Sequence, residues 1–302
     1  MSEYYIDHEN SGLPSLKRMD SGEITIADSR DDSRMTLVIS ERHEKADHSA
    51  QIGSWLNGFA LTVGDEQILI NGGQNGISLF HDNSFVKPTL LTVNQDYATE
   101  RPVVIIESFE DVLILVSDAA FLYNNTVVEK AARIWVVCNP NMMFVADYVA
   151  SKQPVRLDTK FTINHEGNTV NINVYNQHRL VLRKGKEALK LFQALNCVDG
   201  KAVETTLCLG SNCEDPRRES CEASPKSASV YGWTCDRAGC VHQRIHTFMM
   251  DAEREIKFWH LRQTDEFVRL EAPDHENTLD FRFTEDGFFV RRNGRTRHWC
   301  CL

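Results

Sequence analysis

Short apolar runs alternate with turn-forming residues along almost the whole chain of 302 residues. The runs are rich in Val, Ile, Leu and Phe and only a few residues long, which is typical of β-strands. Gly, Asn, Asp and Pro separate them, as at 64–66, 71–73 and 139–141, and these residues favour tight turns. The clearest runs span 35–39, 59–63, 67–70, 103–106, 112–116, 134–138, 143–148 and 170–174. Many strands at close spacing predict stacked antiparallel sheets, because each sheet must bury a face against another.

Helical periodicity is scarce. Residues 186–196 form the one short amphipathic stretch that fits a helix, and the same residues also fit an edge strand followed by a loop. A segment rich in Ser, Pro, Glu and Cys at 209–229 predicts a long exposed loop between strands. We therefore predict an all-β fold, a large antiparallel β-sandwich of several sheets (a supersandwich) with little helix, forming a single domain over residues 1–302.

Acidic residues outnumber basic ones, with 43 Asp and Glu against 33 Lys and Arg and a formal net charge of −10. A nucleic-acid binder needs a basic surface to neutralise phosphates, so we expect no nucleic-acid partner. No run of about 18 apolar residues is present, and the chain opens on an acidic, aromatic segment rather than a basic one followed by an apolar stretch. We therefore expect no membrane partner, no transmembrane segment and no signal peptide in this chain, which leaves the compartment open.

Five of the nine cysteines, from Cys208 to Cys240, lie in one stretch. Disulfides in an oxidising compartment, and a metal site or free thiols in a reducing one, both remain open. The spacing C-x4-C-x7-C-x13-C-x4-C lacks the tight C-x2-C pair of a zinc ribbon, so it does not favour a structural zinc.

Motifs follow one another in a recognisable order. The first stretch reads Asp7-His-Glu-Asn-Ser-Gly, then the run 35–39, then His43-Glu-Lys-Ala-Asp47, then Gly64-Asp-Glu-Gln-Ile-Leu-Ile-Asn71-Gly-Gly. The second comprises 117–123, a strand headed by Arg133, the runs 143–149 and 161–165, and Gly232-Trp233-Thr234-Cys235. This order resembles the C-terminal β-sheet domain of the heparinase II/III polysaccharide lyases over nearly the whole chain.

The resemblance implies β-elimination of uronic-acid-containing polysaccharides. In that chemistry a base removes the proton beside the carboxylate, a cation or amide neutralises the carboxylate, and an acid protonates the leaving oxygen. Family members carry most of these groups on an α-helical toroid that precedes the β-domain, and this sequence has no helical region to form one. The implied partners are an acidic polysaccharide and a separate toroid subunit, and the family is usually periplasmic or secreted.

The family's β-domain supplies a His-x-His-Ala-Asp motif, which corresponds here to His43-x-Lys45-Ala-Asp47. The resemblance thus gives His43, Lys45 and Asp47 as candidate catalytic residues. Lys45 replaces the second histidine, and a lysine is a poor proton shuttle near neutral pH unless burial lowers its pKa. Asn71 replaces a turn aspartate that belongs to the metal site of some members. Because an ammonium and an amide replace an imidazole and a carboxylate, we predict no zinc there and no cofactor.

The same resemblance gives Tyr123, Arg133 and Trp233 as candidate substrate-binding residues. Aromatic faces stack on sugar rings, and guanidinium groups bind carboxylates in pairs of hydrogen bonds. The alternatives are structural: Tyr123 and Arg133 as a half-buried strand pair, Trp233 in the core, and the motif around His43 as a turn. Two basic clusters, 179–190 and 291–297, could attract an acidic glycan or form solvated strand faces.

Two functions therefore stand beside each other. The first is a lyase domain that acts with a toroid. The second is a non-catalytic module that binds an acidic glycan or another protein through the same sheet surface, and the loss of the second motif histidine is the reason to consider it.

Overall fold

The computed structural model describes residues 5–6, 13–18, 23–30, 33–40, 57–70, 76–86, 103–123, 127–138, 142–209, 228–251, 258–264 and 267–302. Strands dominate these ranges, in which the only helical element is a single 3-10 turn, η3 (Ala120–Tyr123). The predicted all-β fold with little helix is confirmed. No helix within these ranges has the length and hydropathy needed to cross a membrane.

Sheet A contains the N-terminal strands, the pair β17 and β18, and the second half of the long strand β12 (Met142–Asn164). Its other strands are β1 (Tyr5–Ile6), β2 (Ser15–Arg18), β3 (Glu23–Arg30), β4 (Ser33–Ser40), β5 (Phe59–Val63), β6 (Glu66–Ile70), β7 (Ile77–His81), β8 (Ser84–Phe85), β17 (Thr206–Leu209) and β18 (Ala228–Thr234). Strands β1 to β6 pair antiparallel in sequence order, and β6 and β7 both pair with β12, which pairs with β18 along its other edge.

Sheet B is built around the first half of β12. Its other strands are β9 (Val103–Phe109), β10 (Val112–Asp118), β11 (Val128–Cys138), β13 (Asn171–Asn176), β14 (Arg179–Lys184), β15 (Glu187–Val198), β16 (Lys201–Ala202) and β19 (Gly239–Asp251). The antiparallel order is β9-β10-β11-β12-β19-β15-β14-β13, and β16 pairs with the end of β15.

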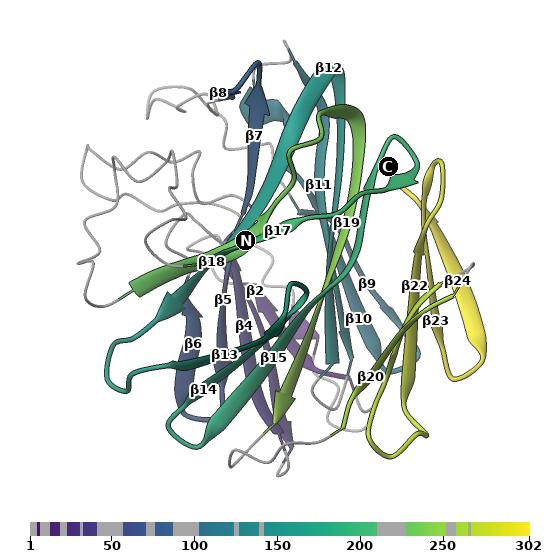
Figure 1. Ribbon diagram of the computed structural model, residues 1–302. Coiled ribbons are helices and arrows are strands. Elements are labelled where there is room, and N and C mark those ends of the chain that lie inside the picture. Colours follow the sequence, from purple (N-terminus) through teal and green to yellow (C-terminus); the bar gives the residue numbers. More distant parts are fainter. Residues whose placement is uncertain are drawn as a thin grey trace, which may run out of the picture.

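Sheet C is a C-terminal meander in which each strand pairs antiparallel with the next. Its strands are β20 (His260–Gln263), β21 (Val268–Glu271), β22 (Thr278–Phe283), β23 (Gly287–Arg292) and β24 (Arg295–Cys300). Figure 1 shows these yellow strands as a layer beside the teal and green strands of sheet B, with the purple and blue strands of sheet A on the other side.

Strand β12 belongs to two sheets. It pairs with β11 as far as Ser151 and with β19 as far as Ala150 and again at Val155, all in sheet B, and from Arg156 it pairs with β7, β6 and β18 in sheet A. The change coincides with a register shift between Ala150 and Val155. Pro154 lies in this shift, where the missing N–H of proline costs no ladder hydrogen bond.

Sheet B is the central layer, and its middle strands β10, β11, β12 and β19 are buried on both faces over most of their length in this sheet. Along β10, Leu113 and Leu115 belong to the core shared with sheet A, whereas Val112, Ile114 and Val116 belong to the core shared with sheet C. A strand buried on both faces needs apolar side chains at every position, because successive side chains point to opposite faces. This layering explains why the sheet B strands appear in the sequence as continuous apolar runs rather than alternating ones.

The stretch 186–196 is not a helix. It forms most of β15, which pairs with β14 on one edge and β19 on the other, so it is not an edge strand either. Its Ala, Leu and Lys residues favour a helix locally, but Leu189 and Leu191 alternate into the core between sheets A and B. Tertiary burial therefore overrides the local preference.

Two predicted connections fall largely outside the described residues. The residues of the 139–141 turn are not described, but β11 and β12 on either side pair antiparallel from Cys138 and Met142 onwards. Of the predicted 209–229 loop, only the first residue and the last two are described, and these belong to β17 and β18. The loop itself stays a prediction.

We expect Phe144→Ala to lower the free energy of unfolding by about 3–5 kcal/mol, because it leaves a cavity in a well-packed core. Phe144 is fully buried, and its ring lies 6.0 Å from the ring of Phe281 across the interface between sheets B and C. Urea unfolding followed by circular dichroism measures the effect. Val104→Ala is the control, since Val104 is 59% exposed. Equal losses for the two variants would contradict the layered arrangement.

Candidate functional site

The candidate catalytic residues His43, Lys45 and Asp47 lie outside the described residues, and so does Asn71. Their catalytic role and the absence of zinc beside them therefore stay predictions. The candidate substrate-binding residues Tyr123, Arg133 and Trp233 are all described.

Trp233 lies in the interior between sheets A and B, where it is fully buried. Its ring centroid is 6.4 Å from that of Phe161 and 5.1 Å from that of His246. The indole N–H donates to the carbonyl of Gln177 at 2.7 Å, which is in the connection between β13 and β14. In this position Trp233 anchors that connection, and both its ring faces are covered by protein.

Tyr123 ends η3 and is only 8% exposed. It packs with Leu122, Val128 and Leu157 in a third apolar cluster, which does not include Trp233. The structure therefore places neither aromatic candidate at the surface.

Arg133 forms a fully buried ion pair with Asp147 on the neighbouring strand. Its Nε donates to Asp147 Oδ1 at 2.6 Å and its Nη2 to Asp147 Oδ2 at 2.9 Å, so the pairing is bidentate. Its Nη1 donates to the carbonyl of Asn57 at 2.6 Å. A guanidinium in this geometry has its donors directed at protein acceptors, so Arg133 has a structural role. It does not form the expected half-buried strand pair with Tyr123, because Arg133 is fully buried and pairs with Asp147, and Tyr123 lies in η3.

The ion pair is part of a polar row that crosses sheet B. Five residues occupy directly paired positions on five successive strands, and they are Ser117 on β10, Arg133 on β11, Asp147 on β12, Arg244 on β19 and Asn196 on β15. All five are buried. Buried polar groups need partners, and cross-strand neighbours are the nearest source of them.

Arg244 ties the polar row to sheet A. Its Nη2 donates to the carbonyl of Leu157 at 2.9 Å and its Nη1 donates to the carbonyl of Trp233 and to Thr159 Oγ1, both at 3.0 Å. Its Nε donates to Asn196 Oδ1 at 3.0 Å. The guanidinium thus joins both halves of the fold at the point where β12 passes between the sheets.

His246 lies beside the polar row, enclosed by aromatic rings. Its ring is 5.2 Å from that of Phe161, and neither ring nitrogen has a hydrogen-bond partner in the described part of the chain. Burial holds the pKa of His246 well below its ordinary value, and the positive charges of Arg244 and Arg133 lower it further. The imidazole is therefore neutral at neutral pH.

The basic clusters are partly internal. In the first, Lys184 pairs with Glu66 at 3.8 Å and Lys190 with Asp251 at 2.6 Å, and both lysines are buried. In the second, Arg292 is buried and pairs with Asp111 at 2.6 Å. These three residues are neither solvated strand faces nor free cations for a glycan. No disulfide joins any two of the seven described cysteines, and Cys213 and Cys221 lie outside the described residues.

A cleft of about 440 Å³ opens between the start of β14, β15, β16 and the first strand of sheet C. Its lining is mixed, with amides, an imidazole, one guanidinium, one carboxylate and a few apolar side chains. It includes Asn176, His178, Arg179, Phe192, Gln193, Asn196, Glu204 and Gln263. This set can donate and accept hydrogen bonds around a polar ligand, which is what sugar hydroxyl groups require.

Gln193 lies in the wall of the cleft and is 7% exposed. Its carbonyl oxygen accepts hydrogen bonds from Thr205 and lies 3.4 Å from His178 Nδ1. Its amide nitrogen has no partner among the described residues. A buried donor without a partner costs free energy, so a ligand acceptor in the cleft would gain by meeting it.

The polar row continues to this cleft. Asn196 accepts from Arg244 inside the fold, and it also lines the cleft. Trp233 holds the carbonyl of Gln177, the residue before His178 on the cleft rim. The interior residues therefore position the cleft without entering it.

Sequence reasoning missed Gln193, Asn196, Arg244 and His246. The signal for the last two is in the sequence, because Arg244, His246 and Phe248 alternate along a strand-like run. Gln193 and Asn196 carry no such signal, since their stretch also fits a helix.

Comparison with solved structures gives the class of fold. The chain is similar to the heparan sulfate lyase HepC of Pedobacter heparinus, with a TM-score of 0.58 and 10% identity over 95% of this chain and 42% of that one. It is also similar to a heparinase III gene product (TM-score 0.56, 12% identity, 92% of this chain and 41% of that one) and to a second heparinase III structure (0.51, 10%, 94% and 42%). No protein-family model and no curated protein matches the sequence.

The protein thus has a heparinase-like all-β fold, and the resemblance lies at the level of fold with the C-terminal domain of heparinase III. The chain spans about two fifths of the length of those structures.

We expect Asp147→Asn to lower the free energy of unfolding by about 3–5 kcal/mol, because the substitution leaves the buried charge of Arg133 without its counter-ion. Chemical unfolding at pH 7.5 measures the loss. Arg295→Gln is the control. Arg295 also forms an ion pair, with Glu110, but its side chain is 74% exposed. An exposed pair contributes no more than about 1 kcal/mol to stability. A loss for Asp147→Asn as small as that of the control would contradict the role of the ion pair.

We expect the protein to lose stability as the pH falls below about 6.5, with His246 contributing up to about 1.4 kcal/mol per pH unit. The pKa of His246 is lower in the folded state, so below the ordinary pKa the unfolded chain binds the proton and the folded chain does not. His246→Leu removes this contribution and keeps the site apolar.

Unfolding measured at pH 7.5 and 5.5 checks the result. The His246→Leu variant should lose less stability between the two pH values, and burial lowers the pKa of His242 as well, so some dependence persists. His81→Leu, at a partly exposed position, is the matched control. An unchanged pH dependence in His246→Leu would show that His246 does not contribute.

Proposed function

We propose that the chain is the β-sheet portion of a heparinase II/III-type polysaccharide lyase, which takes part in β-elimination of a uronic-acid-containing polysaccharide. The observation that carries the proposal is the fold similarity to a heparan sulfate lyase over 95% of this chain. The ordered motifs in the sequence also support it.

The proposal requires catalytic groups beyond the described residues. β-Elimination needs a base and an acid at the scissile bond and a cation at the carboxylate. Arg133 is the one cation among the candidate substrate-binding residues, and it forms an ion pair with Asp147 in the interior. The base and acid are therefore assigned to the segment His43 to Asp47 and to an α-helical toroid, on this or another chain.

A second candidate function is a non-catalytic module that binds an acidic glycan. The observation that favours it is the cleft beside β15, with the partnerless amide nitrogen of Gln193 and the guanidinium of Arg179 in its lining. Arg179 lies over the ring of Phe192 at 5.0 Å, which holds a cation ready for a carboxylate or sulfate group.

The lyase proposal is tested by the ultraviolet absorbance of the unsaturated uronate product. The chain is incubated with heparan sulfate and other uronic-acid polysaccharides, alone and with a toroid domain. We expect product with the toroid and its loss in His43→Ala, while Lys152→Ala, at an exposed lysine of β12 outside both basic clusters, keeps full activity. No product in either mixture contradicts the lyase proposal.

The binding alternative is tested by retention on immobilised heparan sulfate. If the cleft binds the glycan, Arg179→Ala and Gln193→Leu elute at lower salt than the wild type and Lys152→Ala does not. Identical elution of all four proteins would exclude the cleft as the glycan site.

A further inference from the structure

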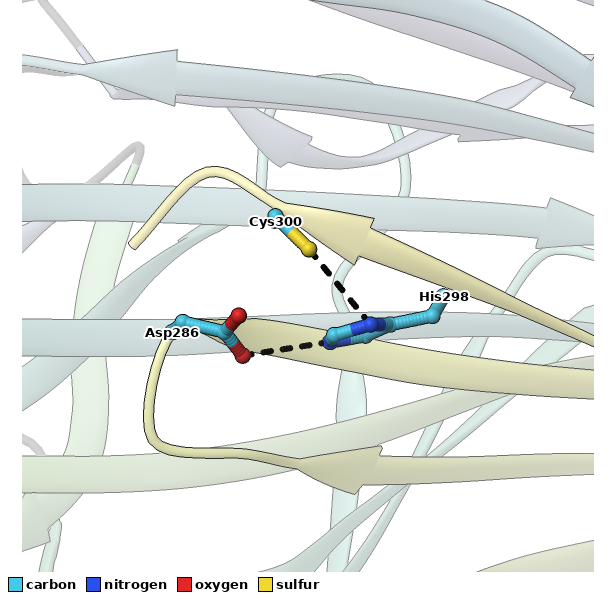
Figure 2. Close-up of side chains that lie close together, drawn as sticks. All are labelled: Asp286, His298 and Cys300. Atoms are coloured by element: carbon cyan, nitrogen blue, oxygen red, sulfur yellow. Dashed lines mark hydrogen bonds and ion pairs between the residues drawn. The ribbon is translucent and has the colours of Figure 1, made fainter.

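Three metal-ligating side chains of different chemistry meet at one end of sheet C. They are Asp286, His298 and Cys300, and one ligand atom from each lies within 4.8 Å of the other two (Figure 2). None of the three residues lines the cleft beside β15.

The strand geometry brings the three together. His298 and Cys300 are two positions apart on β24, so their side chains project from the same face of the sheet. Asp286 immediately precedes β23, whose first residue, Gly287, pairs with Cys300. The amide of Leu302 donates to the carbonyl of Asp286 at 3.0 Å, which holds this end of the hairpin closed.

The imidazole is held between a sulfur and a carboxylate. Cys300 Sγ is 3.5 Å from His298 Nδ1, and Asp286 Oδ1 is 3.3 Å from His298 Nε2 (Figure 2). The ring of Phe289 stacks on the imidazole at 4.4 Å and Thr284 Oγ1 lies 3.1 Å from Nε2, so the ring orientation is fixed.

The sulfur-to-nitrogen distance suits a tetrahedral metal ion. Zinc binds imidazole nitrogen at about 2.0–2.1 Å and thiolate sulfur at about 2.3 Å, so two such ligands of one tetrahedral ion lie roughly 3.5 Å apart. The measured separation of Cys300 Sγ and His298 Nδ1 is 3.5 Å. A carboxylate on the remaining ring nitrogen is the arrangement that orients metal-binding histidines in general.

We propose that Cys300, His298 and Asp286 form a site for a divalent transition-metal ion of the zinc class. Cys300 Sγ and His298 Nδ1 bind the ion, and the carboxylate of Asp286 orients the imidazole through its other nitrogen, Nε2. On binding, the metal–sulfur bond forms and the thiol proton leaves to solvent. Asp286 and His298 are 63% and 29% exposed at their side chains, so water can fill the remaining positions and the ion can exchange.

The class of ion follows from the ligands. Thiolate and imidazole select zinc, cobalt or nickel over magnesium and calcium, which prefer oxygen ligands alone. The site does not depend on the proposed lyase function, and the two can fail separately.

The reduced full-length chain is titrated with cobalt(II) chloride, because a cobalt–thiolate bond gives a charge-transfer band in the near ultraviolet. We expect a band in the wild type that Cys300→Ser lacks, and displacement of cobalt by zinc. His298→Ala and Asp286→Asn should weaken binding by at least about tenfold, the loss that even second-shell changes cause.

Two variants are matched controls. Cys301→Ser changes the adjacent thiol, which packs against the core between sheets B and C, and His275→Ala changes an exposed histidine of the same sheet that pairs with Glu271. Both should titrate like the wild type. The difference between wild type and Cys300→Ser isolates the site from the other cysteines of the chain.

A second measurement uses only the wild-type chain, so its result does not depend on whether a variant folds. Zinc chloride should slow alkylation of Cys300 in the wild type, located by peptide mapping, and leave the rate at Cys240 unchanged. Equal cobalt spectra for wild type and Cys300→Ser, or alkylation of Cys300 that zinc does not slow, would overturn the proposal.

Discussion

Strand β12 must satisfy its backbone hydrogen bonds in two sheets, and much of the structure is organised around that requirement. Where it leaves sheet B it no longer has a continuous ladder, and buried carbonyl groups need other donors. The side chains of Arg244 and His242 reach those groups, at the carbonyls of Leu157 and Val155 respectively. The buried guanidinium of Arg244 and the buried imidazole of His242 therefore follow from the strand's path, since apolar side chains in their places would donate no hydrogen bond to these carbonyls.

The two apolar cores and the polar row stabilise the fold in different ways. Burial on both faces of sheet B supplies the non-directional stabilisation, and the polar row supplies directional contacts that select one relative placement of the sheets. The cleft is formed where this arrangement reaches the surface beside β15. Any function of the cleft therefore rests on residues that no ligand touches, among them Trp233 and Arg244.

Much of the fold could be predicted from the sequence, and less of the site. Continuous apolar runs such as 112–116 indicate a strand buried on both faces, and the turn residues around them indicate antiparallel neighbours. The crossing of β12 could not be predicted, because it depends on pairing Leu157 with Leu79 rather than on any local pattern. The buried state of Lys190 is equally non-local, since it requires Asp251 from another strand. The segment 43–47, central to the family motif, lies outside the described residues.

Sheets A and B are joined through strand β12, whereas sheet C is attached in another way. Within the described residues it shares no strand with them and contacts sheet B through side chains, chiefly the aromatic layer around Phe281 and Trp299 and the pair of Arg292 with Asp111. Backbone hydrogen bonds of the meander can therefore open without breaking a ladder in the other two sheets. Amide protons of sheet C should exchange with solvent deuterium as a separate cooperative unit, whereas those of sheets A and B, joined through one strand, should become accessible together.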